Sequence, residues 1–284
     1  MNELINKYAK QIADKLKDNL EALILVGSYA RGEGVDESSD IEFWAVANDL
    51  SMVRNIQIDS DVSIGYTTRE HLKRLKPYIY TVEVKKYGKV IYGDKDILDL
   101  IPNYSFEDVD PIDGFTLLNN RLVEQLILLN RIEAGEAISQ YEFDKGYIQL
   151  VNSILAINGV YKGLYSEKLS RYMSMPTRQR IIKLTDFDDK VRNAFDRLSK
   201  RANITISGSE AMEQWKELRD YFREIWLCEK KDLAGFACWL KMLVSGRPMR
   251  VWIYRRASNL YLSDMYKDKN RREAVIREWE RFVK

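Results

Sequence analysis

Apolar residues recur along the chain in two different patterns, which divide it into two parts. Helical spacing over residues 2–16 is followed by short apolar or alternating runs, which predict strands separated by polar loops. Farther along, long stretches carry apolar residues every three or four positions, as amphipathic helices do. The pattern predicts an α+β chain, in which a small mixed-sheet domain (residues 1–107) precedes an all-α helical bundle (residues 108–284). The acidic, proline-containing segment 106–113 is the expected boundary.

The strand signals are concentrated in the first part. The run Ala22–Val26 (ALILV) ends at a glycine and a serine, as a buried strand does before a turn. A helix is predicted over Thr68–Leu75, with Thr67 or Thr68 as its cap. The other predicted strands are Ile41–Val46, Ile56–Tyr66, Ile79–Lys85 and Lys89–Tyr92. The helices predicted in the second part are Phe115–Ala137, Phe143–Tyr161, Ser209–Glu229 and Asp232–Val244.

Composition and charge exclude several classes of protein. No stretch approaches the ~18 apolar residues that span a bilayer, and residues 1–16 lack the uninterrupted apolar core of a signal peptide. We therefore expect a cytoplasmic protein that does not bind a membrane. With two cysteines and one histidine, the chain has few of the side chains that usually bind zinc. The net charge of +2 gives no global attraction to nucleic acid.

The residues that suggest chemistry lie between the first two strands. Residues 25–44 read LVGSYARGEGVDESSDIEFW. Glycine lets the backbone at Gly27 approach a ligand, and the amides of the turn, with the Ser28 hydroxyl, can cradle phosphate oxygens. Asp40 and Glu42 are two apart on a predicted strand, so both side chains leave from one face. Paired carboxylates suit Mg²⁺, which in turn binds phosphate. The segment predicts a phosphate cradle beside a metal site.

This segment resembles the signature of the DNA polymerase β-like nucleotidyltransferase superfamily, in which a glycine-serine turn precedes a D-x-[DE] pair. GSYARGE followed by SDIE is closest to the minimal nucleotidyltransferases, and its Asp-Ile-Glu form is similar to that of kanamycin nucleotidyltransferase. The resemblance covers roughly residues 20–95 and implies transfer of a nucleoside monophosphate from a nucleoside triphosphate, with ATP expected. It also implies two Mg²⁺ ions. Glu42 departs from the commoner Asp, which lengthens the reach to the metal.

The resemblance also implies further site residues. A third carboxylate is needed on a following strand, and Asp61 is the best match by position, with Asp59 in reserve. This carboxylate would share a metal with Asp40 and Glu42 and take the proton of the attacking hydroxyl. Arg31 and Ser39 match positions that touch or brace the triphosphate in relatives.

Each of these features has an ordinary structural explanation when it is taken singly. A glycine-serine turn is common after a strand, an Asp-x-Glu pair can be the solvated face of an edge strand, and Asp61 can be a plain exposed carboxylate. Their ordered coincidence, with Arg31 and Ser39 in place, favours a functional site.

The predicted helical part contains fewer residues that indicate a particular chemistry. The resemblance suggests that Lys145 reaches the triphosphate, with Tyr161 or Tyr165 nearby, although a surface lysine and packed tyrosines are the ordinary alternative. The basic aromatic stretch 247–261 could grip RNA by charge and stacking. We favour an amphipathic helix whose arginines face water. His71, the only histidine, is expected at the surface.

Three functions remain for the whole chain. The favoured one is Mg²⁺-dependent nucleotidyl transfer to a hydroxyl of a small molecule, with release of pyrophosphate. The second is transfer to a macromolecule, which would be RNA or, as in antitoxin relatives, AMP onto a protein partner. The third is a non-catalytic nucleotide-binding protein, against which the intact carboxylates argue.

Overall fold

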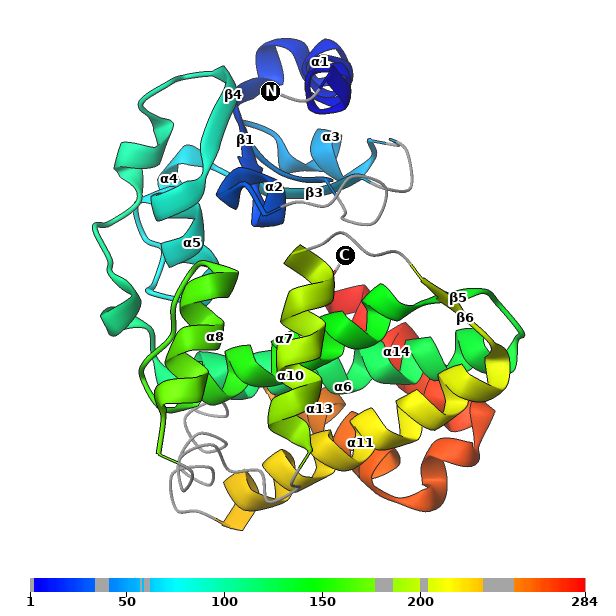
Figure 1. Cartoon of the computed structure of the whole chain (residues 1–284). Helices are drawn as coiled ribbons and strands as arrows, with labels where there is room; N and C mark the ends of the chain where they lie inside the picture. Colours follow the sequence, from blue (N-terminus) through cyan, green and yellow to red (C-terminus); the bar gives the residue numbers. More distant parts are fainter. Residues whose placement is uncertain are drawn as a thin grey trace. The chain divides into compact units, whose positions relative to one another are not determined.

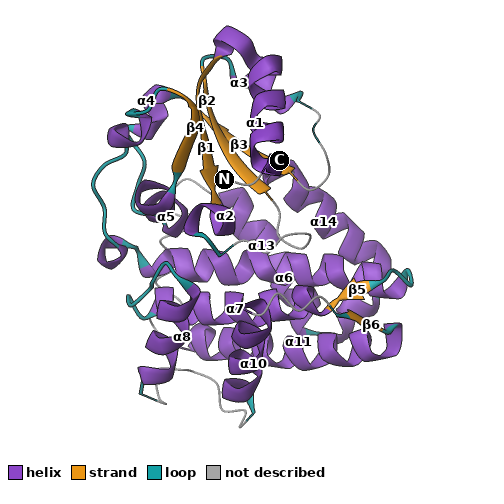
Figure 2. Ribbon diagram, turned by 45° about the horizontal axis from the view of Figure 1, so that its top comes forward, coloured by secondary structure: helices purple, strands orange, loops and turns teal. Residues whose placement is uncertain are grey.

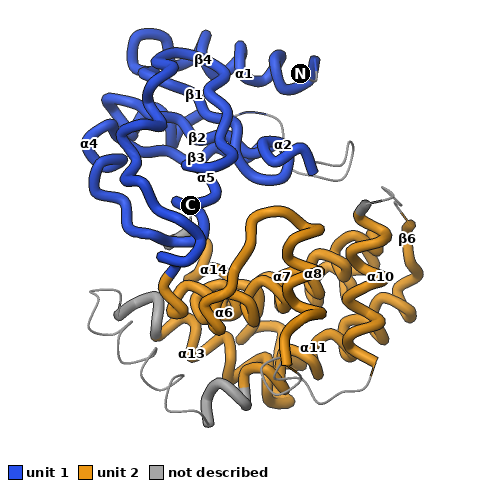
Figure 3. Tube along the Cα trace, turned by 60° about the vertical axis from the view of Figure 1, so that its left-hand side comes forward, with its two compact units in different colours: residues 1–109 blue, residues 110–284 orange. Residues whose placement is uncertain are grey.

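The computed structural model describes residues 3–33, 41–56, 58, 62–176, 186–199, 204–231 and 248–283. The chain divides into two compact units, residues 1–109 and residues 110–284 (Figure 3). Unit 1 contains a four-stranded mixed sheet with helices, and the described part of unit 2 is helical apart from one short strand pair (Figures 1 and 2). The predicted fold class, α+β with a small mixed sheet followed by a helical region, is confirmed.

The sheet of unit 1 has the strand order β3–β2–β1–β4. Strand β1 runs antiparallel to both of its neighbours, and β2 and β3 run parallel. The strands are β1 (Leu20–Val26), β2 (Ile41–Ala47), β3 (Val62–Thr67) and β4 (Lys89–Gly93). The predicted strand Ile56–Tyr66 is confirmed from Val62 onward, whereas residues 57 and 59–61 lie outside the described residues.

The helices of unit 1 are α1 (Glu3–Leu16), α2 (Gly27–Arg31), α3 (Leu50–Arg54), α4 (Arg69–Leu72) and α5 (Ile79–Tyr87). Short 3-10 turns lie at Lys17–Asn19, Ile97–Leu100 and Phe106–Asp108. Thr68 caps α4, because its hydroxyl accepts a hydrogen bond from the amide of His71.

The predicted strand Ile79–Lys85 is wrong, because this segment is helix α5. Its β-branched and aromatic residues resemble a strand sequence. Val82 and Val84, however, are both buried, and Val84 belongs to the apolar cluster on one face of the sheet. Tertiary packing therefore overrides local propensity here.

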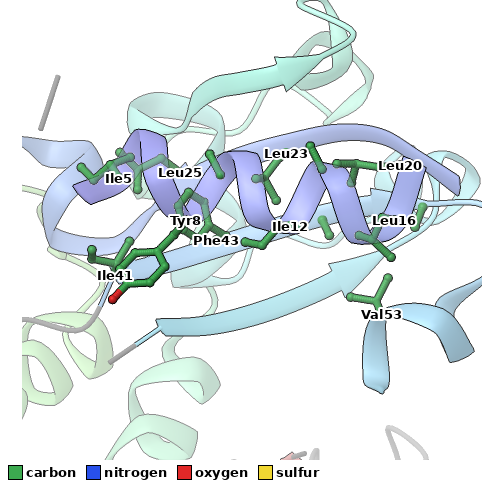
Figure 4. Close-up of a cluster of buried hydrophobic side chains, with 14 of the residues drawn as sticks. Ile5, Tyr8, Ile12, Leu16, Leu20, Leu23, Leu25, Ile41, Phe43 and Val53 are labelled. Atoms are coloured by element: carbon green, nitrogen blue, oxygen red, sulfur yellow. The ribbon is translucent and has the colours of Figure 1, made fainter. Parts of the chain in front are cut away.

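Each face of the sheet is covered by its own apolar cluster. On one face, Ile5, Tyr8, Ile12 and Leu16 of α1 lie on side chains of β1 and β2 that include Phe43 (Figure 4). On the other face, Trp44 and Val46 pack with Leu72 of α4 and Val84 of α5. Strand alternation therefore directs Glu42 to the face that carries α5, whereas Ile41 and Phe43 enter the α1 core.

Unit 2 is built on two long helices that lie close together. Its described helices are α6 (Pro111–Glu133), α7 (Gln140–Ile157), α8 (Tyr165–Ser174), α10 (Phe187–Ser199), α11 (Gly208–Lys231), α13 (Pro248–Leu262) and α14 (Lys269–Val283). Strands β5 (Ile138–Ser139) and β6 (Thr205–Ile206) pair antiparallel. A Cβ at Gly114 of α6 would come within 2.7 Å of the Ala156 Cβ of α7, so glycine permits this close approach. The predicted helix Asp232–Val244 lies outside the described residues.

Buried polar contacts tie the helices of unit 2 together. Asp144 of α7 is almost fully buried and accepts hydrogen bonds from two nitrogens of Arg197 on α10. The buried indole of Trp215 on α11 donates to the Gln125 carbonyl of α6 at 2.8 Å. Such paired contacts satisfy groups that would otherwise be costly to bury. Within the described ranges, no helix has the length and apolarity needed to cross a membrane.

Candidate active site

The Glu42 carboxylate lies against the backbone of Gly27, where β1 passes into α2. Val26, the last residue of β1, is the antiparallel partner of Glu42 in β2. Gly27 has φ +68°, a left-handed conformation that favours glycine. A Cβ built on Gly27 would overlap the Oε2 atom of Glu42. The absence of a side chain at residue 27 therefore provides the space in which the carboxylate lies.

Helix α2 begins directly at Gly27, whereas the sequence predicted only a tight turn followed by a loop. It ends at Arg31, and the left-handed Gly32 that follows donates its amide back to the carbonyls of Ser28 and Tyr29. Ser28 is half-buried in the first turn of the helix. The glycine, the serine and the Glu42 carboxylate thus come from one compact strand–helix–strand arrangement.

Arg31, at the end of α2, is bound by two carboxylates. Its Nε donates to Glu33 at 2.8 Å, and its Nη1 donates to Glu83 of α5 at 2.9 Å. The Arg31 side chain is only 8% exposed. This arginine was predicted as a nucleotide contact, and the structure places it in an ion-paired cluster of unit 1.

Helix α5 brings two residues to the site that the sequence did not indicate. Tyr80 and Glu83 are three apart on the helix and therefore share one side of it. The Tyr80 ring packs edge-on against Trp44 with 5.3 Å between ring centroids. Tyr80 as a whole is 43% exposed, but desolvation of its hydroxyl, followed by the negative charges of Glu42 and Glu83, raises the pKa of Tyr80. The sequence did not indicate this pair because the segment was predicted as a strand, in which residues three apart point to opposite faces.

Several predicted residues lie outside the described residues, namely Ser39, Asp40, Asp59 and Asp61. Their immediate neighbours are described. Ile41, which follows Asp40, is the Cα partner of Val62, which follows Asp61. Among the described residues alone, no group of three or more histidine, cysteine, aspartate or glutamate side chains could hold a metal ion.

Of the residues predicted in unit 2, Lys145 lies in α7 and Tyr165 begins α8, whereas Tyr161 lies in the segment between these helices. Lys145 is half-buried on α7, with its ammonium 5.9 Å from the centre of the Tyr141 ring. Tyr161 is buried, and the buried Lys168 lies over the rings of both Tyr161 and Tyr165. The contact of Lys145 with a triphosphate stays a prediction.

From Pro248 onward the basic aromatic stretch forms helix α13, in which Arg255 is exposed and Arg256 is half-buried. Tyr254 and Tyr261 are buried and cannot stack on RNA bases. Trp252 is exposed, but the Arg256 guanidinium lies over its ring and also pairs with Glu278. His71 is exposed, as predicted.

A scan of protein-family models finds no match to this chain. A protein of Methanocaldococcus jannaschii named "putative protein adenylyltransferase" is 29% identical to it over 105 residues, which make up 37% of this chain and 95% of the relative. The aligned length is close to that of unit 1, which has 109 residues. The similarity supports nucleotidyl transfer as the general class of activity, with a nucleotide and an acceptor as substrates.

Proposed function

We propose that this chain is a Mg²⁺-dependent nucleotidyltransferase that moves a nucleoside monophosphate from a nucleoside triphosphate, preferably ATP, to a hydroxyl of a small molecule. The observation that carries this proposal is the Glu42 carboxylate lying on Gly27. A left-handed glycine whose missing side chain makes space for a carboxylate is more than an ordinary turn requires. This arrangement fits a carboxylate that coordinates a metal ion beside a turn whose amides can bind phosphate.

The strand register supports a shared role for Asp40, Glu42 and Asp61. Neighbouring strands lie about 4.8 Å apart, and Ile41 and Val62 are direct partners. Asp40 and Asp61 are each one peptide bond from these partners. We therefore propose that Asp40 and Asp61, which directly precede these partners in the sequence, complete the metal site with Glu42.

Carboxylate oxygens are the ligands that a hard divalent cation such as Mg²⁺ prefers. Asp40, Glu42 and Asp61 would hold Mg²⁺, and a bound ion would supply positive charge to the triphosphate and to the attacking oxygen. Asp61 accepts the proton of the acceptor hydroxyl, with Asp59 as the second candidate. The hydroxyl oxygen bonds to the α-phosphorus, the bond from that phosphorus to the α,β-bridging oxygen breaks, and pyrophosphate leaves. Ser28 and Ser39 orient the triphosphate.

A protein hydroxyl is the second candidate acceptor, and the printed name of the relative favours it. Against it stands the length of this chain, because the 105 aligned residues make up 95% of the relative but only 37% of this chain. A large additional unit is consistent with binding a separate small acceptor, because small-molecule sites need several walls. The net charge of +2 does not favour RNA.

The activity is tested with nucleoside triphosphates labelled at the α-phosphate, Mg²⁺, and separate panels of hydroxylated small molecules and proteins. We expect label on a small molecule, pyrophosphate release without RNA, and a loss on the order of a thousandfold in Asp40→Asn. Label found only on protein would select the second acceptor. An Asp40→Asn variant as active as the wild type would refute the assignment of the site.

A further inference from the structure

We infer that Glu83 is a positioning residue of the nucleotide site, and that it acts by holding Arg31. The inference rests on the proposed function. It begins from an ion pair that spans 52 residues of sequence and joins α2, which starts at Gly27, to α5. At 2.9 Å, the Arg31 Nη1 and the Glu83 Oε2 form a direct charge-assisted hydrogen bond.

Burial makes this pair stronger than an ordinary surface ion pair. The side chains of Arg31, Glu33 and Glu83 are 8%, 15% and 16% exposed. Charges removed from water are screened less by solvent and salt, so breaking one partner costs more than at the surface. Arg31 is therefore a firm link between the end of α2 and the side of α5.

The position of α2 matters because of what lies at its other end. Helix α2 has only five residues, so a shift at Arg31 moves Gly27 as well. Gly27 is the residue against which the Glu42 carboxylate lies. Glu83 thus fixes, through Arg31, the geometry in which the turn and the carboxylate face one ligand. Displacements of about 1 Å in such a site can lower rates up to a hundredfold.

The effect of the Glu83 charge on nucleotide affinity distinguishes a positioning role from simple electrostatic repulsion. A carboxylate near a bound triphosphate repels it, so removing the Glu83 charge should tighten nucleotide binding if charge alone decides. If Glu83 positions the site, Glu83→Gln should weaken binding even though it removes a negative charge. The two effects predict opposite changes in affinity.

The same unit offers a matched control. Arg69 also pairs with two carboxylates, at 2.6 Å from Glu21 and 2.5 Å from Asp94. Glu21 lies six residues before Gly27 along β1, which is about 20 Å of extended strand. Glu21→Gln therefore makes the same chemical change in a second cluster of one arginine and two carboxylates, at the other end of the strand.

The experiment measures the dissociation constant of ATP with Mg²⁺ by calorimetry, nucleotidyl transfer, and thermal unfolding. Glu83→Gln should weaken ATP binding and slow transfer by on the order of tenfold each, whereas Glu21→Gln leaves both unchanged. Arg31→Met should lose at least as much as Glu83→Gln, and the double variant no more than Arg31→Met alone. Glu83→Asp, which keeps the charge, should recover part of the loss even if Glu83→Gln unfolds at a lower temperature.

Two outcomes would overturn the inference in different ways. If the wild type binds and transfers nucleotide but Glu83→Gln matches it or binds ATP more tightly, the positioning role is wrong and the proposed function stands. Losses that multiply in the double variant would likewise show that Arg31 acts independently of Glu83. If the wild type neither binds nor transfers nucleotide, the proposed function fails and the inference falls with it.

Discussion

The two ends of strand β1 carry similar chemical groups that are arranged for different purposes. Each end has a left-handed glycine, and each has an arginine bound by two carboxylates. At the carboxyl end, the space left by Gly27 is filled by the Glu42 side chain. At the amino end, the space at Gly93 is closed by the Glu21 backbone. One glycine makes room for a carboxylate, and the other lets two strands approach.

The arginine clusters differ in the same way. The Arg31 side chain is 8% exposed and lies in the helix that begins at Gly27. The Arg69 side chain is 38% exposed and connects α4 to the start of β1 and the end of β4. Similar residues therefore belong to the proposed site at one end of the strand and support the fold at the other. Composition alone does not distinguish these roles, whereas the neighbours of each group do.

The largest difference expected between the two ends of β1 is the one between their glycines. Gly27→Ala should drive the Glu42 carboxylate out of its position and lower nucleotidyl transfer by on the order of a hundredfold, with an unfolding free energy reduced by about 1–2 kcal/mol of backbone strain. Gly93→Ala adds a clash with the Glu21 carbonyl and should lower the unfolding free energy by more than ~2 kcal/mol. Its activity per folded molecule should stay near that of the wild type.

Transfer rates and chemical unfolding of both variants, measured side by side, check this contrast. A Gly27→Ala protein with normal transfer would show that the Glu42 contact has no part in catalysis. A Gly93→Ala protein as stable as the wild type would show that the close strand approach is not needed.

The carboxyl end of β1 was largely predictable from sequence, because its key residues are neighbours along the chain. The Ala22–Val26 run, Gly27 and the i, i+2 spacing of Asp40 and Glu42 are local signals. The physical reason for Gly27 was not predictable, since it depends on a side chain 15 positions away. Sequence suggested space for phosphate, and the structure shows space taken by Glu42.

Glu83 was missed for two physical reasons. Its segment is rich in residues that favour strands, and only packing against Trp44 and the rest of the sheet selects a helix. Its partner, Arg31, is 52 residues away, and no local sequence pattern predicts an ion pair of that separation. The helices α6 and α7, by contrast, show long and regular apolar spacing and were predicted well.

The smallest expected effect is a pH dependence at the amino end. The hydrogen bond from Arg69, with a second from the Asp96 amide, lowers the pKa of Asp94 in the folded chain. A lowered folded pKa gives stability that is present above the unfolded value of 3.8 and lost as the pH falls through the folded pKa.

Melting curves of the wild type and Asp94→Asn should therefore differ slightly at pH 6 and converge below about pH 4. Because this cluster is partly exposed, added salt should also reduce the difference. Transfer activity should be the same in both proteins at pH 7. A difference in melting temperature that grows on acidification would contradict this account of Asp94.

The most direct test of the central claim is the effect of Glu42→Gln on nucleotidyl transfer. The change keeps the shape of the side chain on Gly27 and removes its charge. The account predicts that wild-type transfer from α-labelled ATP stops when EDTA removes Mg²⁺, and that Glu42→Gln transfers at least about a hundredfold more slowly with an unchanged melting temperature. A Glu42→Gln protein that transfers nucleotide at the wild-type rate would contradict it.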